Sequence, residues 1–390
     1  MGLIDNANCY SMTKNHKVII AVSIIIVAIL ITIFYFSPRH AAESQQITKE
    51  NEIITIKSLP TPEKVKGIYM TGYAFSSLSF RQRLIDLVEN TELNTLVIDF
   101  KDPAGKLMFE PQDEVLRNWP ISKASLAYTD YKKIITDLQD KNIYTIARIT
   151  TFQDPTAVAT FKNLALRNAG GGIWLDNRGI SWLDMTNPTS WDLVVRQAKE
   201  AKEIGFDEIQ FDYIRFPSDG NIKTISYSNF PPEKKRFEIL NDFFSYLKTE
   251  LRNIDIPLSI DLFGLTYWQR SDPNYDLGIG QRLTDAAKYF DYISPMVYPS
   301  HYYSGIMGFD NPAAHPYEIV NKAMRDGNIM IAAASSTAQS RPWLQDFNMG
   351  AVYTASMIKA QIKAADENNT SGWLLWNAGN KYTSGALGKE

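Results

Sequence analysis

The chain has 390 residues, of which 45% are hydrophobic and 21% are charged, and its formal net charge at pH 7 is -3. This balance excludes disordered, collagen-like and coiled-coil proteins, and it provides no basic surplus for binding nucleic acid. The single cysteine, Cys9, excludes a disulfide scaffold, a cysteine-rich zinc site and an iron–sulfur cluster.

An apolar segment near the start of the chain predicts a membrane span. Val18 to Phe36 contains no charged residue, and as a helix it would be about 28 Å long, close to the thickness of a bilayer core. The alternative is a cleaved signal peptide, whose apolar region is usually shorter, about 7–15 residues. Lys14 and Lys17 precede the run and Arg39 follows it, a mild bias toward a cytoplasmic N-terminus.

These features predict a single-pass protein of the cell membrane with one large extracytoplasmic domain. Pro60 and Pro62 lie in a polar stretch that is typical of a spacer between a membrane and a folded domain. The predicted parts are a short cytoplasmic tail (1–17), a transmembrane signal anchor (18–36), an extracytoplasmic linker (37–65) and the large domain (66–390).

Within the large domain, β-rich runs alternate with segments of helical periodicity. The predicted strands are Lys66–Gly72, Thr95–Phe100, Tyr144–Ile149, Glu208–Ile214, Pro257–Leu262, Tyr292–Val297, Ile329–Ala333 and Gly372–Trp376. The predicted helices are Arg81–Asn90, Asp130–Asp140, Ser190–Glu203, Pro232–Arg252, Asp276–Tyr289, Pro316–Asp326 and Ala351–Glu367. This α/β alternation predicts a (β/α)₈ TIM barrel. The alternative, an open doubly wound sheet, lacks the glycine-rich nucleotide motif after its first strand.

Several predicted strands place charged residues on the face that would point into the barrel. In the strand that begins at Glu208, residues 208, 210 and 212 share a polar face, while Ile209 and Phe211 form the apolar face that must meet the helices. The inward polar residues near strand ends are Asp99, Lys101, Arg148, Gln210, Asp212 and Asp261. A self-neutralising ion-pair cluster is the alternative reading, but buried charges are costly and favour a functional site at the carboxyl ends of the strands.

The remaining motifs narrow the chemistry. Beyond the region near the membrane only His301 and His315 occur, without the spacing of a zinc site, and no GxSxG motif is present. A pair of carboxylates without a metal or cofactor is the chemistry of glycosidic bond cleavage. Aromatic rings that could stack on sugars are supplied by Trp119, Trp174, Trp182, Trp268, Trp343 and Trp376.

One segment resembles a known family. Residues 205–220, GFDEIQFDYIRFPSDG, are similar to the signature of a bacterial family of TIM-barrel domains that is assigned to the glycoside hydrolases and is loosely related to the α-amylase clan. Further similar segments occur in the same order at 67–73, 91–102, 182–192 and 293–303. The resemblance therefore spans nearly all of residues 66–380.

The resemblance implies the roles of two aspartates. In α-amylase-like barrels the nucleophile ends the fourth strand and the general acid lies on the fifth, which are the places of Asp212 and Asp261. Asp99 is a third candidate for a catalytic carboxylate. Two positions differ from that pattern, because Asp261 stands where glutamate is usual and Gln210 stands where arginine is usual.

We therefore predict a membrane-anchored glycoside hydrolase that acts on a cell-envelope or extracellular polysaccharide. Arg148 or Arg215 would keep Asp212 ionised, and an apolar environment would keep Asp261 protonated. The residues expected to bind the sugar are Lys101, Arg148, Gln210, Tyr213, Arg215, Tyr298, His301, Trp376 and Asn377. Two alternatives remain open: a non-catalytic polysaccharide-binding barrel and a polysaccharide lyase.

Overall fold

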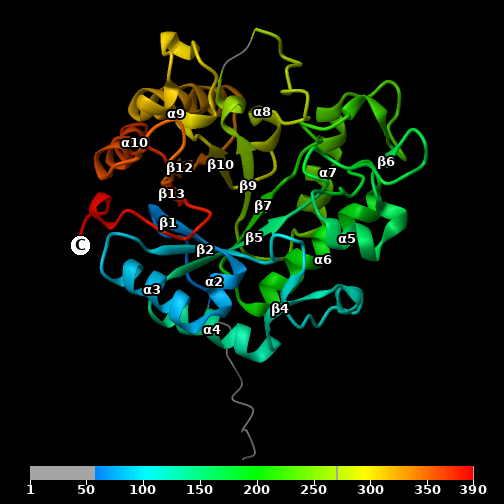
Figure 1. The fold of residues 1–390 in the computed structure, drawn as a ribbon, viewed down its shortest axis with the longest axis horizontal. Helices are drawn as coiled ribbons and strands as arrows, with labels where there is room; N and C mark the ends of the chain where they lie inside the picture. The colour runs from blue at the N-terminus through cyan, green and yellow to red at the C-terminus, as the bar shows by residue number, and fades with distance from the viewer. Residues whose placement is uncertain (1–57, 269–270, 390) are drawn as a thin grey trace, which may run out of the picture. The chain divides into compact units, whose positions relative to one another are not determined.

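The computed structural model describes residues 58–268 and 271–389. Within these residues eight parallel strands close into a barrel, which confirms the predicted (β/α)₈ fold (Figure 1). The strands follow one another around the barrel in chain order, and pairing of the fifth strand with the sixth closes the ring. They are β1 (Val65–Met70), β2 (Thr95–Asp99), β5 (Tyr144–Thr150), β7 (Glu208–Asp212), β9 (Leu258–Phe263), β10 (Tyr292–Met296), β12 (Trp343–Gln345) and β13 (Gly372–Trp376).

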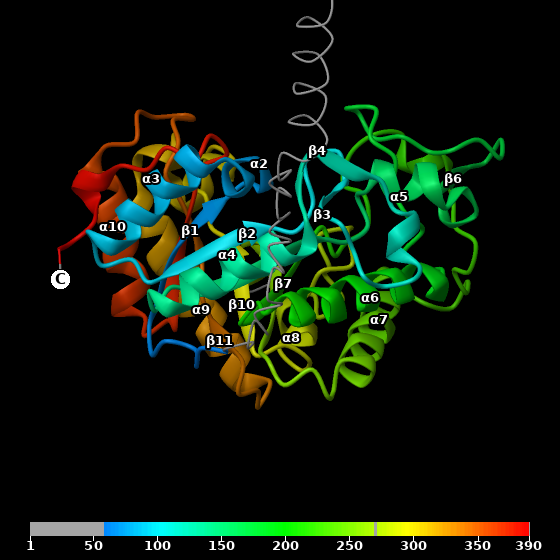
Figure 2. The same ribbon diagram turned by 90° about the horizontal axis from the view of Figure 1, so that it is seen from below.

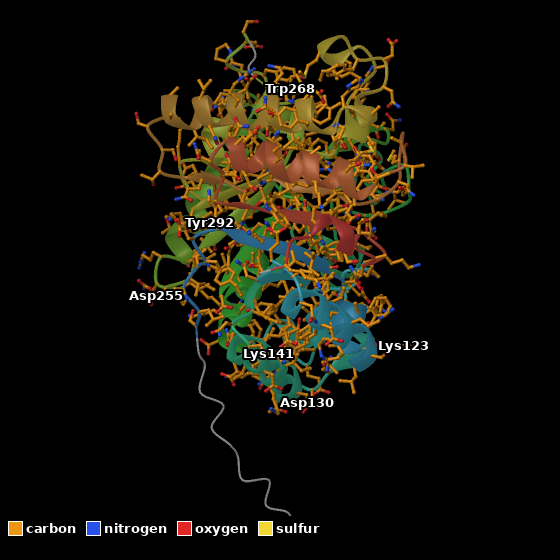
Figure 3. All side chains as sticks on the ribbon, turned by 90° about the vertical axis from the view of Figure 1, so that its left-hand side faces the viewer. Lys123, Asp130, Lys141, Asp255, Trp268 and Tyr292 are labelled. Carbon is orange, nitrogen blue, oxygen red and sulfur yellow. The ribbon has the colours of Figure 1, made fainter. Side chains whose placement is uncertain are left out.

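Helices surround the strands on the outside of the barrel (Figures 1 and 2). They are α2 (Gly72–Ser76), α3 (Leu78–Glu89), α4 (Tyr128–Asp140), α5 (Pro155–Thr160), α6 (Pro188–Ile204), α7 (Arg236–Glu250), α8 (Leu283–Ala286), α9 (Pro316–Ala333) and α10 (Ala355–Glu367). Four short strands lie outside the barrel, as the pairs β3 (Leu107–Phe109) with β4 (Ile121–Leu126) and β6 (Arg167–Asn168) with β8 (Ile225–Ser226). Lys123 on β4, Asp130 on α4 and Lys141 at the end of α4 have exposed side chains on the outer surface of the domain (Figure 3).

The boundaries of α6 follow from its end residues. The Asn187 side chain accepts a hydrogen bond from the Thr189 N–H at 3.0 Å, and Pro188 occupies the first helical position, where the N–H that proline lacks is not needed. Gly205 ends the helix with φ at 113°, in the left-handed region that favours glycine. These residues turn the chain directly into β7, which carries Asp212.

Several predicted elements differ from the structure. The strand predicted at Ile329–Ala333 is wrong, because these residues complete α9, where Ile331 is buried and Ile329 is exposed as helical periodicity requires. The seventh barrel strand is instead β12, preceded by the two-residue strand β11 (Gln339–Ser340). The helix predicted from Pro232 begins at Arg236, and only Leu283–Ala286 of the range 276–289 is α-helical.

The barrel has an apolar outer face and a mixed interior. Side chains such as Ile98, Ile209 and Phe211 are fully buried between the strands and the helices. The interior has its own apolar cluster, which consists of Val65, Tyr69, Val97, Tyr144, Ile146, Tyr298, Trp343 and Leu374. The alternation along each strand therefore matches the predicted assignment of inward and outward faces.

The last residues of the predicted linker contact the barrel at the amino ends of its strands. The Leu59 N–H donates to Asp207 Oδ1 at 2.7 Å, and Thr61 Oγ1 lies 3.0 Å from the hydroxyl of Tyr144. Leu59 also packs against the interior apolar cluster. Residues 58–64 thus cover the end of the barrel opposite to the carboxyl ends of the strands.

The described part of the chain contains no helix that is both long enough and apolar enough to cross a membrane. The predicted span at 18–36, and the predicted linker up to residue 57, lie outside the described residues.

Candidate active site

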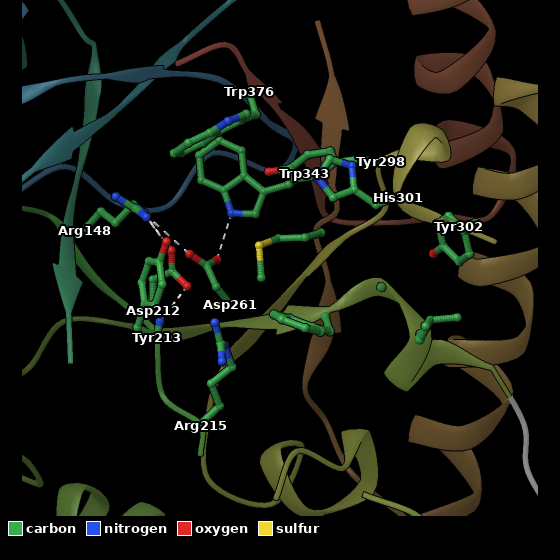
Figure 4. Close-up of a pocket in the computed structure, with 14 residues that line it drawn as sticks. Arg148, Asp212, Tyr213, Arg215, Asp261, Tyr298, His301, Tyr302, Trp343 and Trp376 are labelled. Atoms are coloured by element: carbon green, nitrogen blue, oxygen red, sulfur yellow. Dashed lines mark hydrogen bonds and ion pairs between the residues drawn. The ribbon is translucent and has the colours of Figure 1, made fainter. Parts of the chain in front are cut away.

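Arg148, on β5, lies at the centre of a buried charge cluster at the carboxyl ends of the strands (Figure 4). Its Nη1 donates to Asp99 Oδ1 at 2.6 Å, and its Nε donates to Asp212 Oδ2 at 3.1 Å. Its Nη2 donates to the same Asp212 oxygen, and its Nε lies 3.9 Å from Asp261 Oδ2. One guanidinium therefore faces three carboxyl groups from β2, β7 and β9.

Asp212 is fixed from two sides. Arg148 holds Oδ2, and Oδ1 accepts a hydrogen bond from the Tyr213 backbone N–H at 2.6 Å. The backbone of Tyr213 has φ of 52°, a conformation that residues other than glycine rarely adopt and that is found at functional sites. Both oxygens of Asp212 therefore accept hydrogen bonds, and one of them is paired with a guanidinium.

Asp261, on the neighbouring strand β9, has a different environment. It is 1% exposed, and its Oδ1 accepts a hydrogen bond from Trp343 Nε1 at 2.7 Å. Burial raises the pKa of Asp261 well above its usual range, and the negative charge of Asp212 raises it further. Two adjacent aspartates therefore have different environments, as an acid and a neighbouring carboxylate base or nucleophile do.

Asp99 supports this arrangement from β2. Its Oδ2 accepts a hydrogen bond from the Tyr69 hydroxyl, while its Oδ1 is bound by Arg148. Burial raises the pKa of Asp99, against the opposing effect of Arg148. Asp99 does not line the pocket next to Asp212 and Asp261, so its position is that of a group that orients Arg148.

The cluster forms one wall of a pocket of about 420 Å³. Its other walls are mainly aromatic and apolar, as in many small-molecule sites. Trp376 stacks on Tyr69 at a ring distance of 4.0 Å and meets Trp343 edge to face. The lining residues are Arg148, Asp212, Tyr213, Arg215, Asp261, Phe263, Gly264, Leu265, Met296, Tyr298, His301, Tyr302, Trp343 and Trp376 (Figure 4).

The structure brings eight of the predicted site residues together in this pocket, namely Arg148, Asp212, Tyr213, Arg215, Asp261, Tyr298, His301 and Trp376. Three others lie elsewhere. The Lys101 ammonium is buried against Asp154 Oδ2 at 2.7 Å, Gln210 donates to Ser294 Oγ at 3.0 Å inside the barrel, and the Asn377 amide donates to the Asp346 carbonyl. Each of these three side chains is engaged within the protein and does not line the pocket.

Sequence reasoning missed several contributors to the site. Trp343 was expected only to stack on a sugar, yet its indole N–H holds Asp261. It lies on β12, the strand that the sequence misplaced. Tyr69 lies on the inward face of β1, with Gly67, so the alternation along that strand could have identified it. The pocket residues Phe263 and Met296, the last residues of β9 and β10, follow the same inward alternation.

The predicted stacking tryptophans divide into two groups. Trp343 and Trp376 line the pocket, whereas Trp119, Trp174 and Trp182 are buried and Trp268 lies behind the pocket wall against Tyr302. No group of three or more histidine, cysteine, aspartate or glutamate side chains in 58–268 and 271–389 is arranged to hold a metal ion. The cation at the centre of the three aspartates is the guanidinium of Arg148.

A parallel barrel whose pocket opens at the carboxyl ends of its strands is the architecture of many glycoside hydrolases. A family model described as "Putative glycosyl hydrolase domain" matches residues 67–382. The chain belongs to this family of glycoside hydrolases. The match covers every strand of the barrel except the first two residues of β1.

The first two of the following solved structures show the same fold. The glycoside hydrolase domain of PgaB (BpsB) from Bordetella bronchiseptica is 14% identical, covers 80% of this chain and 93% of that chain, and has a TM-score of 0.57. A chitobiase from Flavobacterium johnsoniae is 10% identical, with coverage of 83% and 47% and a TM-score of 0.51. A hypothetical protein from Ruminiclostridium thermocellum is 35% identical, with coverage of 50% and 96% and a TM-score of 0.45. A comparison with curated protein sequences finds no match.

Proposed function

We propose that the protein is a retaining glycoside hydrolase in which Asp212 is the nucleophile and Asp261 is the acid and base. The observation that carries the proposal is the unequal environment of these two adjacent carboxyl groups. Asp212 is paired with Arg148 and with a backbone N–H, whereas burial raises the pKa of Asp261 well above its usual range. Glycosidases use this combination of one ionised and one protonated carboxyl group.

The spacing of the two groups supports retention. Asp212 Oδ2 and Asp261 Oδ2 lie 3.1 and 3.9 Å from the same nitrogen, Arg148 Nε. Retaining enzymes hold their carboxyl groups about 5–5.5 Å apart, and inverting enzymes hold them about 6.5–9.5 Å apart to admit a water molecule. Two oxygens at these distances from one nitrogen lie at most about 7 Å apart, a limit that includes the retaining spacing and excludes most of the inverting range.

The reaction then has two steps. In the first, Asp261 protonates the glycosidic oxygen while a carboxylate oxygen of Asp212 bonds to the anomeric carbon, so that the leaving sugar departs as an alcohol. In the second, the ionised Asp261 takes a proton from water, and the resulting hydroxide displaces Asp212 from the sugar. Because Trp343 donates to Asp261 Oδ1, the proton would be carried by Oδ2, which lies 3.9 Å from Arg148 Nε. Trp376 and Tyr298 would form the walls of the sugar site.

The test is hydrolysis of a panel of cell-wall and capsule polysaccharides by the purified protein, measured as new reducing ends. We expect release from at least one polymer and none from Asp212→Asn. Release accompanied by unsaturated products that absorb in the ultraviolet would instead indicate a lyase. Binding of a polymer that survives in Asp212→Asn, without release by either protein, would indicate a non-catalytic binding barrel.

We further propose that residues 18–36 anchor the chain in the cell membrane, with residues 1–17 in the cytoplasm, the linker 37–65 outside and the barrel facing the polysaccharide. The support is the uncharged run at 18–36 and the position of the single cysteine, Cys9, before it. In intact cells a membrane-impermeant maleimide should leave Cys9 unlabelled, while Ser44→Cys, beyond the span, should be labelled. Labelling of Cys9 before permeabilisation would overturn this orientation.

A further inference from the structure

Arg215 lies three residues beyond the end of β7 and lines the same pocket as Asp212 and Asp261. It is only 7% exposed. In Figure 4 its side chain extends into the pocket toward Asp261, on the side opposite to Trp376. The pocket therefore contains a second arginine besides Arg148.

The hydrogen bonds of Arg215 leave most of its guanidinium without a partner. Nη1 donates to the Phe216 carbonyl at 3.1 Å and to Ser218 Oγ at 3.2 Å. Nε and Nη2 donate to no atom of the described residues, and no described carboxylate lies within ion-pair distance of Arg215. The two other arginines buried inside the barrel differ, since Arg148 is paired with Asp99 and Asp212 and Arg341 is paired with Glu208.

Aromatic rings hold the Arg215 guanidinium in place without neutralising its charge. Its Cζ lies 4.9 Å from the centre of the Phe263 ring and 5.0 Å from that of Trp182, with Tyr213 at 5.4 Å. Such contacts stabilise a cation modestly. Asp212 and Asp219 attract Arg215 only from beyond ion-pair distance. A buried charge without a bonded counter-ion is costly, and the cost is offset when a ligand supplies one.

We infer that Arg215 receives a carboxylate carried by the substrate, so that this hydrolase acts on an acidic polysaccharide. The inference rests on the proposed function and names its substrate class. The planar guanidinium presents adjacent N–H donors that match the two oxygens of a carboxylate. A carboxylate fits better than a phosphate dianion, because two acidic side chains, Asp212 and Asp261, line the same pocket and a second negative charge on the ligand would add repulsion.

A sugar can carry this carboxylate in two places. In a hexuronic acid it replaces the hydroxymethyl group on C5, and in a muramic acid it belongs to a lactyl ether on O3. Both groups present the same planar anion to Arg215 but at different distances from the anomeric carbon. Comparison of the two kinds of sugar therefore identifies the source.

The test is ligand-observed NMR with the full-length protein and pairs of monosaccharides. The acidic probes are glucuronate, galacturonate and N-acetylmuramate, and their neutral partners are glucuronamide, galactose and N-acetylglucosamine. We expect one kind of acidic sugar to bind at least about tenfold more tightly than its neutral partner. Arg215→Gln should abolish this preference, whereas Arg252→Gln, at an exposed arginine away from the pocket, should retain it.

Equal binding of acidic and neutral sugars, or a preference that persists in Arg215→Gln, would overturn the inference. If Arg215→Gln does not fold, the comparison of glucuronate with glucuronamide in the unaltered protein still decides it. A carboxylate preference without hydrolysis of any polymer would support Arg215 and overturn the hydrolase. Hydrolysis of a neutral polymer without any carboxylate preference would support the hydrolase and overturn the inference about Arg215.

Discussion

The barrel contains two buried arginine–carboxylate clusters, one at each end of its strands. At the amino ends, Arg341 pairs with Glu208 through both guanidinium Nη atoms, and both side chains are fully buried. At the carboxyl ends, Arg148 meets Asp99, Asp212 and Asp261. The first cluster balances one cation with one carboxylate, whereas the second places three carboxyl groups around one cation.

The two clusters also differ in their access to a pocket. Glu208 Oε1 accepts a hydrogen bond from Ser259 at 2.6 Å, and Oε2 accepts one from Tyr144 at 3.2 Å, so protein atoms surround the pair. Around Arg148, by contrast, two of the carboxyl groups line a pocket. A buried ion pair in a barrel is therefore not in itself an active site. The excess of carboxyl groups and their access to a pocket distinguish the two ends.

The strongest test of this difference is Asp212→Asn. We expect hydrolysis to fall by roughly 10⁴-fold or more, because the nucleophile is lost. The melting temperature should change little, since Arg148 keeps Asp99 as its counter-ion. Initial rates and thermal unfolding measured on the same preparation check both parts. Undiminished turnover would remove Asp212 from the mechanism.

Asp261→Asn should reduce the rate less than Asp212→Asn does. Loss of a general acid typically costs about 10²–10⁴-fold. The loss should be smaller for a substrate with a good leaving group, such as an aryl glycoside, because such a group departs without protonation. Kinetics on the polymer and on the aryl glycoside make the comparison. An equal loss on both substrates would contradict the role of acid.

At the opposite end, Glu208→Gln should affect stability rather than chemistry. The variant leaves Arg341 buried without a counter-ion, at a cost of about 3–5 kcal/mol. Urea unfolding measures this loss, and the folded fraction should keep its rate per molecule. A variant that unfolds like the unaltered protein but hydrolyses nothing would reverse the roles of the two ends.

The pH dependence should also separate the clusters. The acid acts only when protonated, and burial raises the pKa of Asp261 well above its usual range. The ratio kcat/KM should therefore stay high below the pKa of Asp261 in the folded protein and fall as the pH rises through it. Asp261→Asn should lose this fall of kcat/KM with rising pH, and Glu208→Gln should retain it. If kcat/KM of Asp261→Asn falls at the same pH, the fall belongs to the titration of another group.

Strand alternation predicted much of this arrangement from the sequence. It placed Asp99, Arg148, Asp212 and Asp261 on the inward face, and the structure brings all four together at the carboxyl ends. Alternation succeeds here because a strand covered by helices must bury its apolar face outward, which leaves polar residues only the interior. The barrel itself followed from the regular spacing of strands and helices.

Other features depend on contacts that no local sequence pattern predicts. Lys101 follows the same alternation as Asp99, but its long side chain reaches Asp154 instead of the cluster. Trp343 lies on a strand of three residues after a proline, too short for a periodic signal, while the apolar run Ile329–Ala333 has the composition of a strand and is helical. The unpaired state of Arg215 became visible only when its neighbours were placed.

The central claim is that Asp212 attacks the sugar while Asp261 handles the proton. In Asp261→Asn the second step lacks its base, so a glycosyl–enzyme intermediate should accumulate during hydrolysis of an aryl glycoside, whose good leaving group departs without the acid. Mass spectrometry of the quenched and digested protein would locate the sugar. We predict a sugar adduct on the peptide that contains Asp212. An adduct on Asp99, or turnover with inverted stereochemistry and no adduct, would contradict the assignment.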